Sequence, residues 1–105
     1  MVNKAELLAW IERDRAEIIG FLQDFVRAPS PNPPGDTRQA TAVITGFLDR
    51  NGLPWRSVAP VAEWPNIVGS FDGARPGQHL VLNGHIDVFP ADESETWTCL
   101  LYTSD

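Results

Sequence analysis

Cysteine is almost absent from this chain: Cys99 is the single one among 105 residues. One cysteine cannot form a disulfide within the chain, so the sequence predicts a protein of a reducing compartment, the cytoplasm. No stretch approaches the roughly 20 apolar residues that span a membrane, and residues 1–6 lack the apolar block of a secretion signal. Basic residues are also few, with eight Lys and Arg against fourteen Asp and Glu. The net charge of −6 argues against nucleic acid or an anionic membrane as the main partner.

The remaining composition is typical of a small soluble globular domain, with 43% hydrophobic and 10% aromatic residues. Apolar residues at helical spacing predict helices over residues 4–27 and 37–51, the first with Asn3 and Glu6 as a capping box. Gly52 follows the second helix, where a left-handed residue is favoured. Between the helices, the proline-rich residues 29–35 cannot form regular structure. Three strands are predicted after the helices, over residues 55–61, 66–71 and 79–84.

The segment that carries chemistry is residues 80–90, with the sequence LVLNGHIDVFP. An apolar strand runs into Gly84, which lets the backbone turn, and then delivers His85 and Asp87 two residues apart. Neutral imidazole is a good ligand for zinc, cobalt or manganese, and a strand end holds it rigidly. Asp87 would lie on the same side of an extended chain and accept the N–H of the other ring nitrogen. The alternative is a surface or capping pair without metal.

Residues 82–90 resemble the first metal-binding motif of a di-zinc metallopeptidase family. That family includes acetylornithine deacetylase, succinyl-diaminopimelate desuccinylase, aminoacylase and glutamate carboxypeptidase. Similar stretches occur in the same order and spacing elsewhere in the chain, so that the resemblance covers roughly residues 7–98. They comprise the loop after the first helix (25–35), the end of the second helix (47–53), the preceding strand (65–69) and the lead-in to the motif (77–82).

The resemblance implies a role for each residue of the motif. His85 would be a ligand of one of two Zn²⁺ ions, which Co²⁺ or Mn²⁺ can replace, and Asp87 would be the catalytic-site carboxylate that orients His85. The bridging aspartate, the general-base glutamate and the remaining ligands of the family lie downstream and cannot be placed here. The parent protein would be a zinc-dependent hydrolase that cleaves the amide bond of small-molecule N-acyl amino acids or peptides. It would be a homodimer. His79, at the start of a strand, is interpreted as a solvent-exposed residue without function.

The implied fold is α/β, the N-terminal part of a zinc-peptidase-like catalytic domain, with two helices on a mixed sheet over residues 1–98. From Cys99 the family pattern stops, and residues 99–105 match one reading frame of a common transposase sequencing adapter. We therefore expect a truncated chain with a non-native tail, inactive and marginally folded by itself, because one histidine and one carboxylate cannot hold zinc. Two alternatives stay open. The chain is a complete small α/β binding or interaction module without catalysis, or the parent is a dipeptidase or carboxypeptidase rather than a deacylase.

Overall fold

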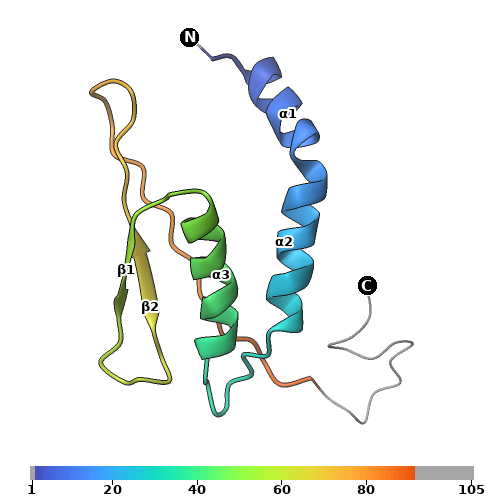
Figure 1. The fold of residues 1–105 in the computed structure, drawn as a ribbon, viewed down its shortest axis with the longest axis vertical. Coiled ribbons are helices and arrows are strands. Elements are labelled where there is room, and N and C mark those ends of the chain that lie inside the picture. The colour runs from blue at the N-terminus through green and yellow to red at the C-terminus, as the bar shows by residue number, and fades with distance from the viewer. Residues whose placement is uncertain (1, 92–105) are drawn as a thin grey trace.

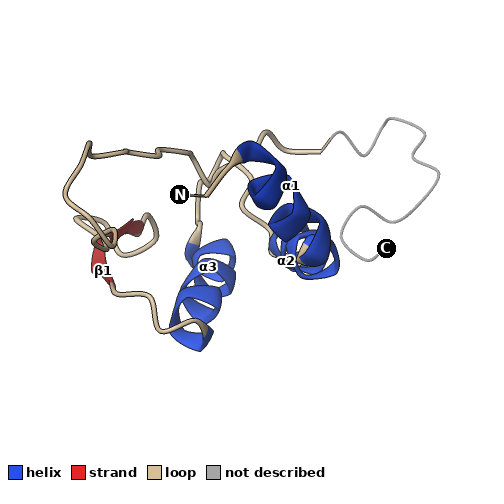
Figure 2. Cartoon of the chain, turned by 90° about the horizontal axis from the view of Figure 1, so that it is seen from above, coloured by secondary structure: helices blue, strands red, loops and turns tan. Residues whose placement is uncertain are grey.

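The computed structural model of this chain describes residues 2–91. Along the chain, three helices precede two strands: α1 (Lys4–Arg13), α2 (Arg15–Arg27), α3 (Arg38–Arg50), β1 (Trp55–Val58) and β2 (Asn66–Gly69). The fold is α/β, as the sequence predicts. Figure 1 shows α3 between the strand pair and the α1–α2 rod, and Figure 2 shows the same order from above. The expected tail, residues 99–105, lies outside the described residues.

The predicted first helix, residues 4–27, forms as two helices that meet at Asp14. It begins with the predicted capping box: Asn3 Oδ1 accepts from the Glu6 N–H at 3.0 Å, and Glu6 Oε2 accepts from the Asn3 N–H at 2.8 Å. The Asp14 carboxylate is bound by Arg13 at 2.7 Å. The backbone of Asp14, with φ −92° and ψ 5°, departs from regular helical values, although its N–H still donates to Trp10 O at 3.0 Å and its oxygen accepts from the Ile18 N–H at 3.0 Å. Aspartate has a low helix propensity, which fits a local departure at this position. Within residues 2–91, none of the helices has both the length and the apolar character that a bilayer crossing requires.

Helix α3 matches the predicted helix over residues 37–51 within one residue at each end. Gly52 follows the C-cap residue Asn51, and its φ of +64° is the predicted left-handed conformation. The Gly52 N–H donates to Asp49 O at 3.1 Å, and the Leu53 N–H donates to Leu48 O at 2.9 Å. This pair of bonds is a Schellman motif, which satisfies carbonyl groups that the helix leaves without partners.

Helix α3 contacts both of its neighbours through aromatic side chains. On one side, Phe47 packs against Phe21 of α2, with ring centroids 5.0 Å apart and planes tilted by 57°. On the other, the Trp55 indole N–H of β1 donates to Asp49 Oδ1 over 2.7 Å. Helix α3 therefore lies between its neighbours: α2 packs against it, and β1 is joined to it by the Trp55–Asp49 hydrogen bond.

Strands β1 and β2 pair antiparallel, with Trp55 opposite Gly69 and Val58 opposite Asn66. The predicted strands over residues 55–61 and 66–71 are therefore present, but each forms only over its first four residues. The sheet in the described part of the chain is antiparallel rather than mixed.

The third predicted strand, residues 79–84, is not formed, and this prediction was wrong. A strand is stable when neighbouring strands satisfy its backbone groups, and no strand pairs with this segment within residues 2–91. Its apolar side chains face solvent, with Leu80 79% and Leu82 86% exposed. The segment crosses from the strand pair towards the end of α2 as extended chain (Figure 1).

The most deeply buried part of the described chain is a short stretch, residues 30–41. Ala40 is the buried hydrophobic residue of this stretch, and Ser30, Thr37 and Thr41 are buried beside it. Elsewhere the large apolar side chains are more exposed, and the radius of gyration is 16.8 Å against about 13 Å for a compact domain of this length. Of these buried residues, Ser30 is bound to the segment of His85 and Asp87, through its hydroxyl and Ile86 O.

Candidate functional site

The structure brings His85 and Asp87 together, in the arrangement that their spacing favours. His85 Nδ1 lies 3.2 Å from Asp87 Oδ1 and 2.8 Å from the Asp87 backbone oxygen. Both neighbours of this nitrogen are acceptors, so Nδ1 carries the proton and donates, and Nε2 of the neutral ring keeps its lone pair. The histidine side chain is 84% exposed and the aspartate side chain 40% exposed. Nε2 is therefore the atom of this pair that can bind a metal ion or a substrate.

The loop that follows α2 holds the segment of His85 and Asp87 in place. The Asn32 N–H donates to Val88 O at 2.8 Å, and the Val88 N–H donates to Ser30 O at 3.0 Å. These two bonds form a parallel bridge between Pro31 and Val88. The Ser30 hydroxyl also donates to Ile86 O at 2.9 Å. The residues on both sides of Asp87 are thus tied to the loop that follows α2.

Asn32 is a third polar side chain at the site. Its Nδ2 donates to Asp87 Oδ2 at 3.0 Å, while Oδ1 of the same carboxylate faces His85. The bond from Asn32 is the largest cause that lowers the pKa of Asp87; the bond from His85 also lowers it, and burial acts in the opposite direction. The carboxylate is therefore held ionised, as a partner of a histidine N–H requires.

Sequence reasoning missed Asn32 because it lies 55 positions before Asp87, in a segment identified only as a proline-rich loop. Neither periodicity nor motif spacing links two positions so far apart. The one local signal is the turn-forming run around Asn32, which indicates a fixed loop but not its partner.

His85 was predicted to be a metal ligand, and few other potential ligands lie near it in the described residues. Within residues 2–91, no group of three or more His, Cys, Asp or Glu side chains is placed to hold a metal ion. Structural and catalytic zinc sites use three or four protein ligands. His85 can therefore supply one ligand, and the described residues do not complete a zinc site around it.

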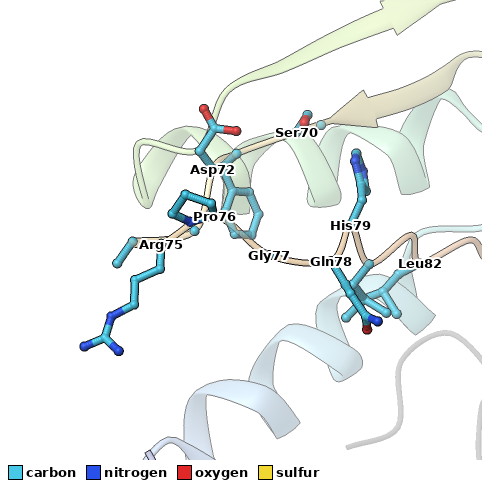
Figure 3. A pocket seen from close by; sticks show the side chains of 13 residues that line it. Ser70, Asp72, Arg75, Pro76, Gly77, Gln78, His79 and Leu82 are labelled. Atoms are coloured by element: carbon cyan, nitrogen blue, oxygen red, sulfur yellow. The ribbon is translucent and has the colours of Figure 1, made fainter. Parts of the chain in front are cut away.

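A hollow of about 820 Å³ lies along residues 69–80 and Leu82, away from the His85–Asp87 pair. Figure 3 shows that its charged and polar side chains do not converge: Arg75 points away from the ribbon on one side and His79 on the other. His79 lines this hollow, whose lining includes neither His85 nor Asp87. A smaller, mainly apolar hollow of about 200 Å³ lies beside Asp87, lined by Ser30, Ile86, Val88 and neighbours from the end of α2.

Two curated proteins, both named N-formyl-4-amino-5-aminomethyl-2-methylpyrimidine deformylase, are similar to this chain. The protein from Halalkalibacterium halodurans is 34% identical over 95 residues, which is 88% of this chain and 22% of that protein. The protein from Bacillus subtilis is 28% identical over 90 residues, which is 83% of this chain and 21% of that protein. The chain therefore spans about a fifth of the length of the curated relatives it matches. No family model matches the chain, and no solved structure does.

These relatives correct the family predicted from the sequence. The motif over residues 82–90 and its flanking matches predicted the di-zinc metallopeptidases, whereas the proteins that the chain matches are deformylases of an N-formyl aminopyrimidine. The prediction of that metallopeptidase family was wrong. The motif consists of a predicted strand, a glycine turn and a His-x-Asp triplet. Such a short local pattern does not by itself identify the class of hydrolase that contains it.

Proposed function

We propose that this chain is part of a larger hydrolase that removes the formyl group from an N-formyl aminopyrimidine, a small-molecule substrate. The observation that carries this proposal is the 34% identity over 95 residues to a deformylase of that name. The second relative, from another species, carries the same name and matches over nearly the same share of the chain. The matched share also includes most of residues 2–91, within which His85 and Asp87 are paired.

Deformylation is the hydrolysis of an amide bond. Water adds to the formyl carbon, the C–N bond breaks, the amine nitrogen takes a proton, and formate leaves. The reaction needs a base that takes a proton from the water and donors that stabilise the charge on the carbonyl oxygen. Within residues 2–91, the His85–Asp87 pair is the candidate for a part in this reaction, because Nδ1 of His85 faces Asp87 and the ring is exposed to solvent.

The role that fits His85 is that of a zinc ligand. Its Nδ1 is occupied by Asp87, so Nε2 is the free donor atom, as in metal-bound histidines that give their other nitrogen to a carboxylate. A bound zinc ion would polarise the formyl carbonyl of the substrate and lower the pKa of a bound water molecule. The further ligands belong to parts of the larger hydrolase other than residues 2–91. In this chain, Asp87 fixes the ring and raises the basicity of the donor nitrogen.

A complete small binding module, the alternative from the sequence, receives less support. Such a module needs a core of its own, and Ala40 is the buried hydrophobic residue of the described chain. The three consecutive apolar residues 80–82 are also exposed, whereas a complete module would cover such residues with other parts of its own fold.

The test is a formate-release assay on the complete gene product. The purified protein is incubated with N-formyl-4-amino-5-aminomethyl-2-methylpyrimidine, and in parallel with an N-acetylated amino acid and a dipeptide. We expect formate from the first substrate and no hydrolysis of the other two, with zinc found by mass spectrometry of the purified protein. Hydrolysis of the dipeptide or the acetylated amino acid without release of formate would overturn the proposal.

A further inference from the structure

We propose that Asn32 is a positioning residue that fixes the Asp87 carboxylate, so that Asp87 holds the His85 ring with its N–H on Nδ1. The geometry behind this is a chain of two side-chain bonds. Asn32 Nδ2 lies 3.0 Å from Asp87 Oδ2, and Asp87 Oδ1 lies 3.2 Å from His85 Nδ1. The expected change in activity rests on the proposed function, whereas the expected change in the tautomer of His85 does not.

The orientation of the Asn32 amide follows from chemistry. An ionised carboxylate only accepts hydrogen bonds, so the group that faces Asp87 Oδ2 must be the NH₂ and not the carbonyl of Asn32. With one carboxylate oxygen held by Asn32, rotation of the carboxylate breaks a bond. The other oxygen therefore stays in place for His85.

The backbone of Asn32 is itself fixed, which makes its side chain a reliable anchor. Its N–H is bound to Val88 O at 2.8 Å, one residue beyond Asp87. Behind it, the Gly35 N–H donates to Pro31 O at 2.8 Å and closes a turn. Gly35 has a φ of +83°, which glycine adopts without strain. The amide is thus presented by a closed turn that is paired with the segment it acts on.

Loss of the bond from Asn32 leaves one oxygen of the Asp87 carboxylate without its side-chain partner, so the carboxylate is free to turn. A carboxylate that turns no longer faces Nδ1 of His85 at a fixed place, and the bias of His85 towards an N–H on Nδ1 is reduced.

The test compares Asn32→Ala and Asn32→Asp with Asn51→Ala in the complete gene product. Asn32→Asp keeps the size of the side chain, removes the NH₂ donor and places a second negative charge beside Asp87. Asn51 is the matched control, since its Nδ2 donates to Phe47 O at 2.9 Å in another part of the chain. Chelated, ¹⁵N-histidine-labelled protein is studied by NMR at a pH of about 8.5, where free imidazole is neutral. The signals of His85 are assigned by their loss in His85→Gln.

We expect the wild type and Asn51→Ala to show a protonated Nδ1 at His85. In both Asn32 variants, a fraction of His85 should shift to a protonated Nε2. In the metal-loaded enzyme, kcat for formate release should fall by about 10- to 100-fold, the size of effect seen when a residue behind a metal ligand is lost, while KM stays within about twofold. A protonated Nε2 in the wild type, or unchanged tautomers and kcat in Asn32→Asp, would overturn the role of Asn32. A wild type that releases no formate would overturn the proposed function alone, because the tautomers still decide the role of Asn32.

Discussion

Ser30 and Ile86 are 56 positions apart in the chain, and the Ser30 hydroxyl donates to the Ile86 backbone oxygen over 2.9 Å. Ser30 is 4% exposed, so this bond is made away from water. Because Ile86 stands between His85 and Asp87, the bond fixes the peptide that joins the two residues of the candidate site. The loop after α2 therefore determines where this pair lies.

Replacement of Ser30 by alanine should destabilise the protein by about 1–3 kcal/mol, because the partly buried Ile86 oxygen loses its partner. The backbone bond from Val88 N–H to Ser30 O does not depend on the side chain and should remain. Ser57→Ala, on the exposed strand β1, is the control and should change stability by less than about 0.5 kcal/mol. Urea denaturation of the complete gene product measures both values. Equal effects of the two substitutions would contradict the importance of the Ser30–Ile86 bond.

The two histidines of the chain should differ sharply in their effect on activity. His85→Gln removes the proposed ligand and should lower formate release by about a hundredfold or more, with loss of bound zinc. His79→Gln should leave kcat/KM within about twofold, because His79 lines the larger hollow, whose lining includes neither His85 nor Asp87 (Figure 3). Steady-state kinetics and metal analysis of both variants provide the comparison. A loss in His79→Gln as large as that in His85→Gln would place the chemistry elsewhere.

Acid should weaken the start of α3. Hydrogen bonds from the Arg38 guanidinium, as short as 2.7 Å, are the main cause that lowers the pKa of the Asp36 carboxyl; the Arg38 backbone N–H also lowers it, and burial opposes both. A carboxyl whose pKa is lower in the folded state stabilises the fold fully above its unfolded pKa of about 3.9. That contribution is lost as the pH falls through the lower, folded value.

The pair can be tested by ¹³C NMR titration of the Asp36 carboxyl in the complete gene product. In Arg38→Gln, the pKa of Asp36 should rise towards its ordinary value. Arg56→Gln, which removes an arginine from exposed strand β1, should leave it unchanged. The same Asp36 pKa in the wild type and in Arg38→Gln would show that the contact does not persist in solution.

Residues 1–105 expressed alone should unfold over a broad temperature range and bind a dye for exposed apolar surface. The radius of gyration of 16.8 Å, against about 13 Å for a compact domain, and the exposure of Phe89 at 94% indicate that the chain buries little of its apolar surface. Scanning calorimetry and dye fluorescence measure these properties. A sharp cooperative transition in a clean monomer would contradict the expectation.

The elements that the sequence predicts correctly are those whose cause is local. The capping box at Asn3 and Glu6 depends on residues three positions apart, and the left-handed Gly52 depends on the helix turn before it. The break at Asp14 was missed because the apolar spacing continues across it, and because the departure is confined to the backbone of Asp14, while the hydrogen bonds to Trp10 and from Ile18 continue.

The parts that the sequence could not predict depend on distant segments. The apolar residues 79–84 have the composition of a strand, but a strand needs partners, and none pairs with them within residues 2–91. The spacing of His85 and Asp87 was enough to predict that they meet. The place of Asn32 beside them was not predictable, because it depends on a bridge between Pro31 and Val88.

The turn at Gly35 has a consequence for how this protein tolerates mutation. A Cβ added at Gly35 would lie 3.3 Å from both Cγ and Oδ1 of Asn32, at a φ of +83° that other residues rarely adopt. The absence of a side chain at Gly35 therefore leaves room for the Asn32 amide. Substitution of Gly35 would crowd that amide and strain the turn that presents it, so we expect the candidate site to be sensitive to change at a position that carries no chemistry of its own.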